Sequence, residues 1–192
     1  MNRLVILTVG KTHSGKTTFA KALENELMNS LVIDQDNHAE FLHTYYEKLL
    51  PENGPNEIKH SITQTIVDYA INETGCHLIL SNSNRNQKGR LQLLEHFHAK
   101  KFTSIIVNFN ISNEILKERV KNSQRGTSVL RTALTFEEVL RRQQSEDVMA
   151  PMEGEADHLL TINHENEVQL IIQQIIHIAN SRLINNKNKS LL

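Results

Sequence analysis

An eight-residue segment near the N-terminus constrains the fold of this chain more than any other part of its sequence. Residues 10–17 read Gly-Lys-Thr-His-Ser-Gly-Lys-Thr and match the pattern G-x-x-x-x-G-K-[ST]. The segment follows the apolar run Leu4–Val9 and leads into Lys16–Met28, which carries apolar residues at helical spacing (Phe19, Ala20, Leu23 and Leu27). A buried strand, a glycine-containing loop and an amphipathic helix in this order are the opening unit of an α/β fold.

The rest of the chain continues this alternation of strand-like and helix-like segments. Four more short apolar runs predict buried strands: Leu31–Asp34, His77–Ser81, Thr103–Phe109 and His158–Ile162. Helices are predicted over Pro55–Ile71, after a Ser112 N-cap, after a capping box at Thr135, and over Glu167–Leu183. No repeat or linker interrupts the order. We therefore expect one α/β domain over residues 1–184 with a mainly parallel sheet, followed by a polar tail over residues 185–192.

The composition limits the classes of function. The net charge is −1 with histidine neutral, so the chain lacks the general basic field that draws a protein to nucleic acid, and we expect no nucleic-acid partner. Cys76 is the only cysteine, which excludes a disulfide framework. No apolar run approaches the ~20 residues that span a membrane. We expect a cytoplasmic protein that is a monomer or a homodimer.

The residue types of the loop suit the phosphate chain of a nucleotide. Its glycines let the backbone curl so that successive N–H groups point at phosphate oxygens, and the following helix adds its positive N-terminal end. Lys16 can reach the β- and γ-phosphates, and the Thr17 hydroxyl can bind Mg²⁺. No guanine-reading Asn-Lys-x-Asp segment stands in the expected strand context, so ATP is favoured over GTP. The residues predicted to contact the nucleotide are Gly10, His13, Ser14, Gly15, Lys16, Thr17 and Thr18. The side chain of His13 itself is expected to face solvent.

With this loop in this context, the chain resembles the P-loop kinases of the nucleoside monophosphate kinase type. It is most similar to the small AAA-like ATP-binding kinases that include gluconate-kinase-like and polynucleotide-kinase-like members. The resemblance covers nearly the whole chain, although only the phosphate-binding loop is a highly specific match. It implies a three-layer α/β/α fold with a five-stranded parallel sheet in the order 2-3-1-4-5, an ATP site at the loop, and a mobile lid rich in arginine.

The second predicted strand ends in Asp34-Gln35-Asp36. Ligands of a parallel sheet bind beyond the carboxyl ends of its strands, where a carboxylate could act as a general base. The resemblance implies the same place for an Asp-x-Asp, where one carboxylate accepts the acceptor's hydroxyl proton or helps to hold Mg²⁺ through water. The alternative is that Asp34 or Asp36 only caps the next helix, whose pattern starts near Asn37. The residues leave the choice between the two aspartates open.

The third predicted strand lacks the acid that P-loop proteins often carry at its end. It continues into the polar segment Ser81-Asn82-Ser83-Asn84, whose side chains could hydrogen-bond a substrate. Mg²⁺ would then depend on Thr17, phosphate oxygens, water and the pair of aspartates. Arg85 and Arg90 follow, either as contacts to an anionic group or as solvated residues at the start of a helix.

The segment Arg119–Thr135 is the candidate lid, because it carries four basic residues and no acidic one (Arg119, Lys121, Arg125 and Arg131). Guanidinium groups suit the charge of a phosphoryl group in transfer. In the resemblance, an arginine that ends the helix before the lid touches the nucleotide, and Arg119 matches it. Relatives often place a second arginine one turn later, where this chain has Ser123, so Arg125 is the next candidate. The alternative is a solvated basic loop.

Three hypotheses of function follow. The first is a phosphotransferase that moves the γ-phosphoryl group of ATP, with Mg²⁺, to a small-molecule acceptor. A hydroxyl acceptor is favoured because a phosphate acceptor needs no base. The second is a nucleotide kinase, and the third is an ATP-binding switch or regulatory ATPase that transfers nothing. The predicted catalytic residues of the first hypothesis are Lys16, Asp34, Asp36, Arg119 and Arg125.

Overall fold

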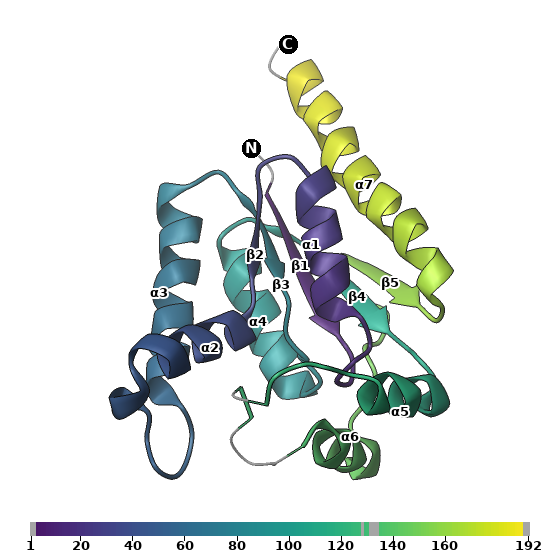
Figure 1. The fold of residues 1–192 in the computed structure, drawn as a ribbon. Helices are drawn as coiled ribbons and strands as arrows, with labels where there is room; N and C mark the ends of the chain where they lie inside the picture. The colour runs from purple at the N-terminus through teal and green to yellow at the C-terminus, as the bar shows by residue number, and fades with distance from the viewer. Residues whose placement is uncertain (1–2, 128, 131–134, 190–192) are drawn as a thin grey trace.

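The computed structural model of the chain describes residues 3–127, 129–130 and 135–189, with side-chain environments as far as residue 181. Five parallel strands form one sheet in the order β2-β3-β1-β4-β5 (Figure 1). The strands are β1 Leu4–Val9, β2 Ser30–Ile33, β3 His77–Leu80, β4 Thr103–Phe109 and β5 His158–Ile162. The α/β class, the parallel sheet and its strand order are therefore confirmed.

Seven α-helices and two short 3-10 turns connect the strands within the described residues. The helices are α1 Lys16–Glu26, α2 Gln35–Tyr45, α3 Glu57–Glu73, α4 Gln87–Ala99, α5 Asn113–Lys121, α6 Phe136–Ser145 and α7 Val168–Lys189, and the turns are Glu47–Leu49 and Glu165–Glu167. Helices α1 and α7 cover one face of the sheet and α3 and α4 the other, while α5 and α6 lie beyond its carboxyl end (Figure 1). None of the described helices has the length and apolar character of a membrane span.

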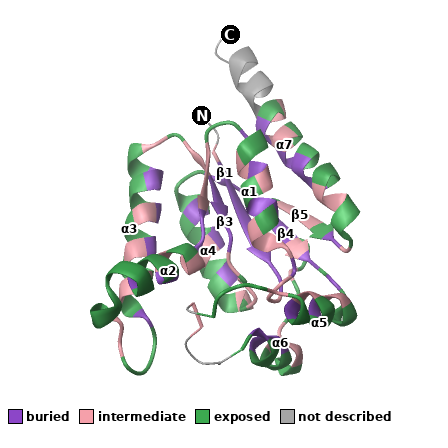
Figure 2. Cartoon of the chain, viewed as in Figure 1, coloured by how far each residue is buried: buried purple, intermediate pink, exposed green. Residues whose placement is uncertain are grey.

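The sheet is buried on both faces because its strands carry apolar residues at odd and even positions alike (Figure 2). In β1, Leu4 and Ile6 belong to the core shared with α1 and α7. Val5 and Leu7 point to the opposite face and belong to the core shared with α3 and α4. The two cores hold the carboxyl ends of β1, β2 and β3 at one edge of the sheet, and the phosphate-binding loop and the two aspartates follow these strand ends.

Side-chain caps set the helix boundaries, and two of them differ from the sequence prediction. Helix α2 begins at Gln35, before the expected start near Asn37, because the Asp34 side chain accepts a hydrogen bond from the Asp36 N–H at 2.9 Å. Helix α3 begins after Pro55, because Asn56 is its N-cap and accepts from the Lys59 N–H at 3.1 Å.

The C-terminal helix is longer than predicted. Helix α7 continues past Leu183 as far as Lys189, so it includes most of the segment expected to form a polar tail. The segment that follows Leu183 contains no glycine or proline that would end a helix, which explains the extension.

A buried ion pair joins α4 to the segment before β5. Arg90 is 1% exposed and makes two contacts with the Glu155 carboxylate, at 3.0 Å through Nε and at 3.1 Å through Nη2. Its Nη1 also donates to the carbonyl oxygen of Arg85 at 2.7 Å. Burial raises the pKa of Glu155, but hydrogen bonds from Arg90 and Gln87 outweigh it and hold this pKa below its ordinary value. Arg90 is therefore a structural residue: it is not the solvated residue that one alternative expected, and its guanidinium is bound to Glu155 rather than held out for an anionic ligand.

Replacing Arg90 with methionine is expected to lower the free energy of unfolding by about 3–5 kcal/mol, because it leaves the Glu155 carboxylate buried without its partner. Urea denaturation followed by circular dichroism measures this loss. The double variant Arg90→Met/Glu155→Met removes both charges and should recover most of the stability. A single variant within about 1 kcal/mol of the parent protein would contradict the assignment.

Candidate functional site

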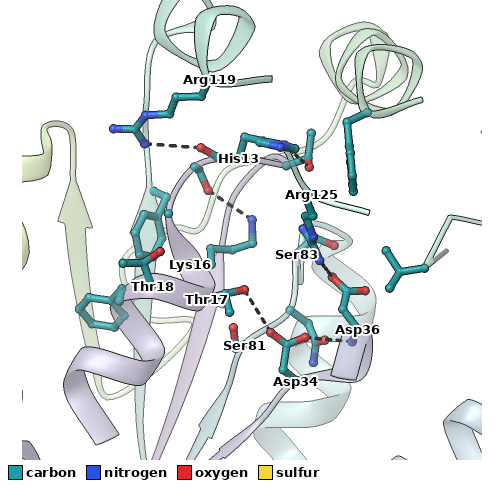
Figure 3. A pocket seen from close by; sticks show the side chains of 18 of the residues that line it. His13, Lys16, Thr17, Thr18, Asp34, Asp36, Ser81, Ser83, Arg119 and Arg125 are labelled. Atoms are coloured by element: carbon teal, nitrogen blue, oxygen red, sulfur yellow. Dashed lines mark hydrogen bonds and ion pairs between the residues drawn. The ribbon is translucent and has the colours of Figure 1, made fainter. Parts of the chain in front are cut away.

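A cleft of about 1030 Å³ opens at the carboxyl end of the sheet, where the sequence predicted the site. Its walls come from the loop between β1 and α1, the first turn of α2, the end of β3, the end of α5 and helix α6 (Figure 3). The candidate lid forms a further wall through residues such as Arg125, Gly126 and Leu130. Residue 128 and residues 131–134, which include Arg131, lie outside the described residues.

The phosphate-binding loop needs its two glycines for different reasons. A Cβ on Gly10 would lie 2.9 Å from both the Phe109 Cβ and the Ser14 Oγ, so a side chain would force the loop away from β4. Gly15 has a φ of 98° and is the N-cap of α1, a left-handed conformation that favours glycine. The Gly10 N–H donates to the Ser83 carbonyl oxygen at 3.1 Å, which anchors the loop to the segment after β3.

Lys16 lies across the inside of the loop. Its Nζ donates to the Lys11 carbonyl oxygen at 2.5 Å and to the Ser14 Oγ at 3.2 Å, so the ammonium group stands in the space that the loop encircles (Figure 3). Burial lowers the pKa of Lys16 to about 8, and the nearby Asp36 carboxylate offsets part of this effect. A phosphate in the loop would replace the uncharged oxygens as partners of this ammonium group.

The lowered pKa of Lys16 predicts a pH dependence of nucleotide binding. Phosphate binds the protonated amine, whose share in the free protein falls from about 90% at pH 7 to about 10% at pH 9. The dissociation constant for ATP should therefore rise about tenfold between these pH values, and binding at pH 9 should take up a proton. Titration calorimetry in two buffers of different ionisation enthalpy measures both quantities. The variant Lys16→Arg stays charged and should lose this dependence, so an equally steep dependence in it would contradict the assignment.

Asp34 caps helix α2, one of the two alternatives that the sequence left open, and it also contacts the phosphate-binding loop. It is 3% exposed, and its Oδ1 caps α2 through the Asp36 N–H. Its Oδ2 accepts a hydrogen bond from the Thr17 Oγ1 at 3.1 Å. A hydroxyl and a carboxylate at this spacing are the oxygen ligands that Mg²⁺ prefers, so the residues present fit the expected metal.

Asp36, two residues after Asp34 in the first turn of α2, occupies a different environment. Its side chain is 46% exposed, and its Oδ2 forms an ion pair with the Arg125 Nη2 at 2.6 Å. The Arg125 guanidinium also lies 5.1 Å from the centre of the Phe136 ring, where a cation–π contact is favourable. Arg125 therefore connects the candidate lid to the first turn of α2 (Figure 3).

Arg119, at the end of α5, reaches the loop from the opposite wall of the cleft. Its Nη1 donates to the His13 carbonyl oxygen at 3.4 Å, and its Nη2 pairs with the Glu165 carboxylate at 3.1 Å. Arg119 and Glu165 also line a second hollow of about 750 Å³ between α5 and the segment after β5. Arg119 thus lies at the loop, and its contact with the nucleotide stays a prediction; its partner Glu165 was not expected from the sequence.

His13 differs from its expected solvent-facing position. Its ring packs edge-on against Phe136 with the ring centres 4.8 Å apart, and its Nδ1 lies 2.9 Å from the Thr12 Oγ1. Burial lowers the pKa of His13, and the positive charge of Arg125 lowers it further. This packing holds α6 against the loop. Because His13 and Phe136 are far apart in the sequence, no local pattern predicts their contact.

The other predicted loop residues are divided between the interior and the surface. Ser14 is buried and accepts the hydrogen bond from Lys16, whereas Thr18 is exposed at the edge of the cleft. The Thr12 N–H donates to the Gln143 side-chain oxygen at 2.7 Å, a contact from α6 that no local sequence pattern signals. Arg85 is bound to Glu146 at 2.6 Å and to the Gln143 carbonyl oxygen at 2.7 Å, so it supports α6.

Comparison with known proteins identifies the class that this fold and this site define. Residues 5–146, most of the chain, match the AAA domain family, and the chain belongs to that family. The family match and the structural neighbours together show that the protein has the ATP-binding fold of the small P-loop kinases. A comparison with curated protein sequences finds no significant match.

Three similar solved structures illustrate the likeness in fold. A candidate kinase from Chloroflexus aurantiacus is 19% identical with a TM-score of 0.65, covering 94% of this chain and 97% of its own. Kti12 of Chaetomium thermophilum in complex with ADP-AlF3 is 17% identical with a TM-score of 0.60, covering 89% and 96%. The APS kinase CysC of Mycobacterium tuberculosis in complex with AMPPNP and APS is 13% identical with a TM-score of 0.58, covering 93% and 98%. At these identities the comparison establishes the fold.

Proposed function

We propose that this protein is a kinase that transfers the γ-phosphoryl group of ATP to a hydroxyl of a small-molecule acceptor. The observation that carries the proposal is the sharing of one cleft by the phosphate-binding loop and by Asp36. The Asp36 carboxylate is half-exposed and lies beneath a lid arginine at 2.6 Å. A nucleotide switch needs the loop, but it has no need of a second carboxylate on the acceptor side of the same cleft.

The roles of the cationic residues follow from their positions. Lys16 holds the β- and γ-phosphates from inside the loop. Its ammonium group is hydrogen-bonded there to uncharged oxygens, and phosphate oxygens can replace them as partners. Arg119 reaches the nucleotide from the end of α5. Arg125 leaves Asp36 when both substrates are present and stabilises the charge on the phosphoryl group in transfer. Mg²⁺ held by Thr17, with Asp34 behind it, would neutralise charge on the phosphate oxygens.

The two aspartates differ in the hydrogen bonds already made to them. Both carboxylate oxygens of Asp34 have donors within the protein, the Thr17 hydroxyl and the Asp36 N–H. Asp36 has one ion-pair partner among the residues that the structure describes, the side chain of Arg125, and that partner can move with the lid. We therefore assign the general base to Asp36. The acceptor oxygen attacks the γ-phosphorus, its proton passes to the Asp36 carboxylate, and the bond between the γ-phosphorus and the bridging oxygen breaks to release ADP.

A nucleotide acceptor has less support. It requires cationic side chains for its own phosphate, and the sequence offered Arg85 and Arg90 for this purpose. Arg90 is buried against Glu155, and Arg85 is bound to Glu146. On the acceptor side, Asp36, Glu40 and Lys59 line the cleft, so the carboxylates of this wall outnumber its ammonium group. A neutral or cationic polyhydroxy compound suits this wall better than an anion.

The proposal is tested by measuring ATP consumption with panels of sugars, nucleosides, aminoglycoside-type antibiotics, nucleoside monophosphates and 5′-hydroxyl oligonucleotides. Stimulation by a hydroxyl compound, with formation of its phosphate ester, is the expected result. Stimulation by monophosphates alone would favour the nucleotide kinase. ATP hydrolysis that no acceptor accelerates would favour the switch or regulatory ATPase.

A further inference from the structure

A buried hydroxyl without a partner stands at the end of β3. Ser81 is 4% exposed, and its Oγ has no hydrogen-bond partner within the described part of the chain. Its neighbours are engaged: the Asn82 side-chain oxygen accepts from the Gln35 N–H at 3.3 Å, and the Asn84 amide donates to the Thr8 carbonyl oxygen at 2.9 Å. Buried polar groups are nearly always satisfied, so an unpaired hydroxyl in a ligand cleft indicates a missing partner.

Ser81 lies beside the proposed metal-binding residues. Its N–H donates to the Ile33 carbonyl oxygen at 2.9 Å, so it is placed next to Asp34 across the β2–β3 pair. Asp34 in turn holds the Thr17 hydroxyl at 3.1 Å, and all three side chains line the same cleft. Figure 3 shows Ser81 next to Thr17 and Asp34 at the foot of the loop.

We propose that Ser81 is an outer-sphere residue of the Mg²⁺ site, which hydrogen-bonds a water molecule of the metal in the Mg²⁺·ATP complex. The inference rests on the nucleotide-binding part of the proposed function. Mg²⁺ usually keeps several waters in its coordination shell, and those waters need acceptors that protein groups supply. Thr17 supplies the direct contact and Asp34 one acceptor behind it. Ser81 supplies another at the strand end where an acid is missing.

A serine hydroxyl at the end of β3 affects Mg²⁺ binding differently from a carboxylate at the same position. It orients water without adding negative charge beside Asp34, so the site carries less charge and holds Mg²⁺ less tightly than one with two carboxylates. The variant Ser81→Asp should therefore tighten Mg²⁺ binding while it weakens the binding of ATP without metal. The variant Ser81→Ala should weaken Mg²⁺ binding and leave metal-free ATP binding unchanged. These opposite directions distinguish a metal-site role from a packing role.

Titration calorimetry with a non-hydrolysable ATP analogue, at graded Mg²⁺ and in EDTA, tests the inference in the full-length chain. For Ser81→Ala we expect the dissociation constant of Mg²⁺ in the ternary complex to rise about tenfold, with the value in EDTA within about twofold of the parent protein. Thermal unfolding without ligand checks that the variant folds. Ser61→Ala, an exposed hydroxyl on α3 bonded to the Glu57 carbonyl oxygen, is the matched control and should change nothing.

Equal weakening with and without Mg²⁺ in Ser81→Ala would overturn the inference, as would an unchanged Mg²⁺ dependence. If Ser81→Ala does not fold, Ser81→Asp still decides the question, since looser Mg²⁺ binding in it would also overturn the inference. None of these titrations requires an acceptor or phosphoryl transfer. ATP hydrolysis that no acceptor accelerates would refute the kinase proposal and leave this inference standing, so the two failures are separable.

Discussion

Replacing Lys16 with alanine is expected to reduce phosphoryl transfer from ATP by at least about 10²-fold, the loss typical when one positioned donor to a developing charge is removed. The ammonium group lies inside the loop, 2.5 Å from the Lys11 carbonyl oxygen and 3.2 Å from the Ser14 hydroxyl. It is thus already held where the phosphates bind, and alanine removes both its charge and its hydrogen bonds. Initial rates of ADP formation at saturating acceptor measure the effect.

The matched control is Lys11→Ala in the same loop. The Lys11 side chain points away from the phosphate position and donates to the Asn113 side-chain oxygen at 2.7 Å, and it does not line the cleft. This variant loses the same charge from the same loop, while its backbone carbonyl still serves Lys16. Near-parent turnover in Lys11→Ala with loss in Lys16→Ala supports the assignment. Full turnover in Lys16→Ala would refute the placement of the nucleotide site itself.

Asparagine at position 36 is expected to lower kcat for acceptor phosphorylation by about 10²–10⁴-fold, because an amide cannot take the proton of the acceptor hydroxyl. At a pH well below the Lys16 pKa of about 8, the dissociation constant of ATP should change little, since Lys16 then stays protonated without the Asp36 charge. Single-turnover rates together with equilibrium nucleotide binding separate the two effects.

The variant Asp34→Asn is the counterpart with the same change of charge. Asparagine caps helices about as well as aspartate does, so α2 should keep its start. The Thr17 hydroxyl would lose its charged acceptor, and we expect weaker binding of Mg²⁺·ATP as the main result. If instead Asp34→Asn abolished transfer without changing Mg²⁺·ATP binding, the base would be Asp34. If both variants retained kcat, a carboxylate mechanism would be wrong.

The sheet was predictable from the sequence because each strand is a short apolar run between polar segments. Leu4–Val9, Thr103–Phe109 and His158–Ile162 begin and end where the apolar pattern does. The helix starts were less predictable, since α2 and α3 depend on which of several adjacent residues accepts a backbone N–H. A sequence shows candidate caps, but the direction of the incoming chain decides which one is used.

The candidate site, like the fold, has parts that the sequence predicts and parts that it does not. Gly10–Thr17 could be placed from sequence because a phosphate-binding loop is made by consecutive residues, and its chemistry needs those residue types at that spacing. The different positions and partners of Arg90 and Arg125 could not be predicted from the sequence. Both are arginines in polar segments, yet Arg90 is buried against Glu155 and Arg125 reaches Asp36 in the cleft. Each partner is distant in the chain, so no local pattern signals it.

The phosphate-binding loop, the run of strands and helices around it, and the pair of aspartates were determined by the sequence alone, because each depends on neighbouring residues. The tertiary structure decided how those residues are used. It placed Asp34 behind the Thr17 hydroxyl, paired Asp36 with a lid arginine and left the Ser81 hydroxyl beside them without a partner among the described residues. These outcomes depend on distances between side chains from different strands and helices, and only the packing of the sheet against its helices sets those distances.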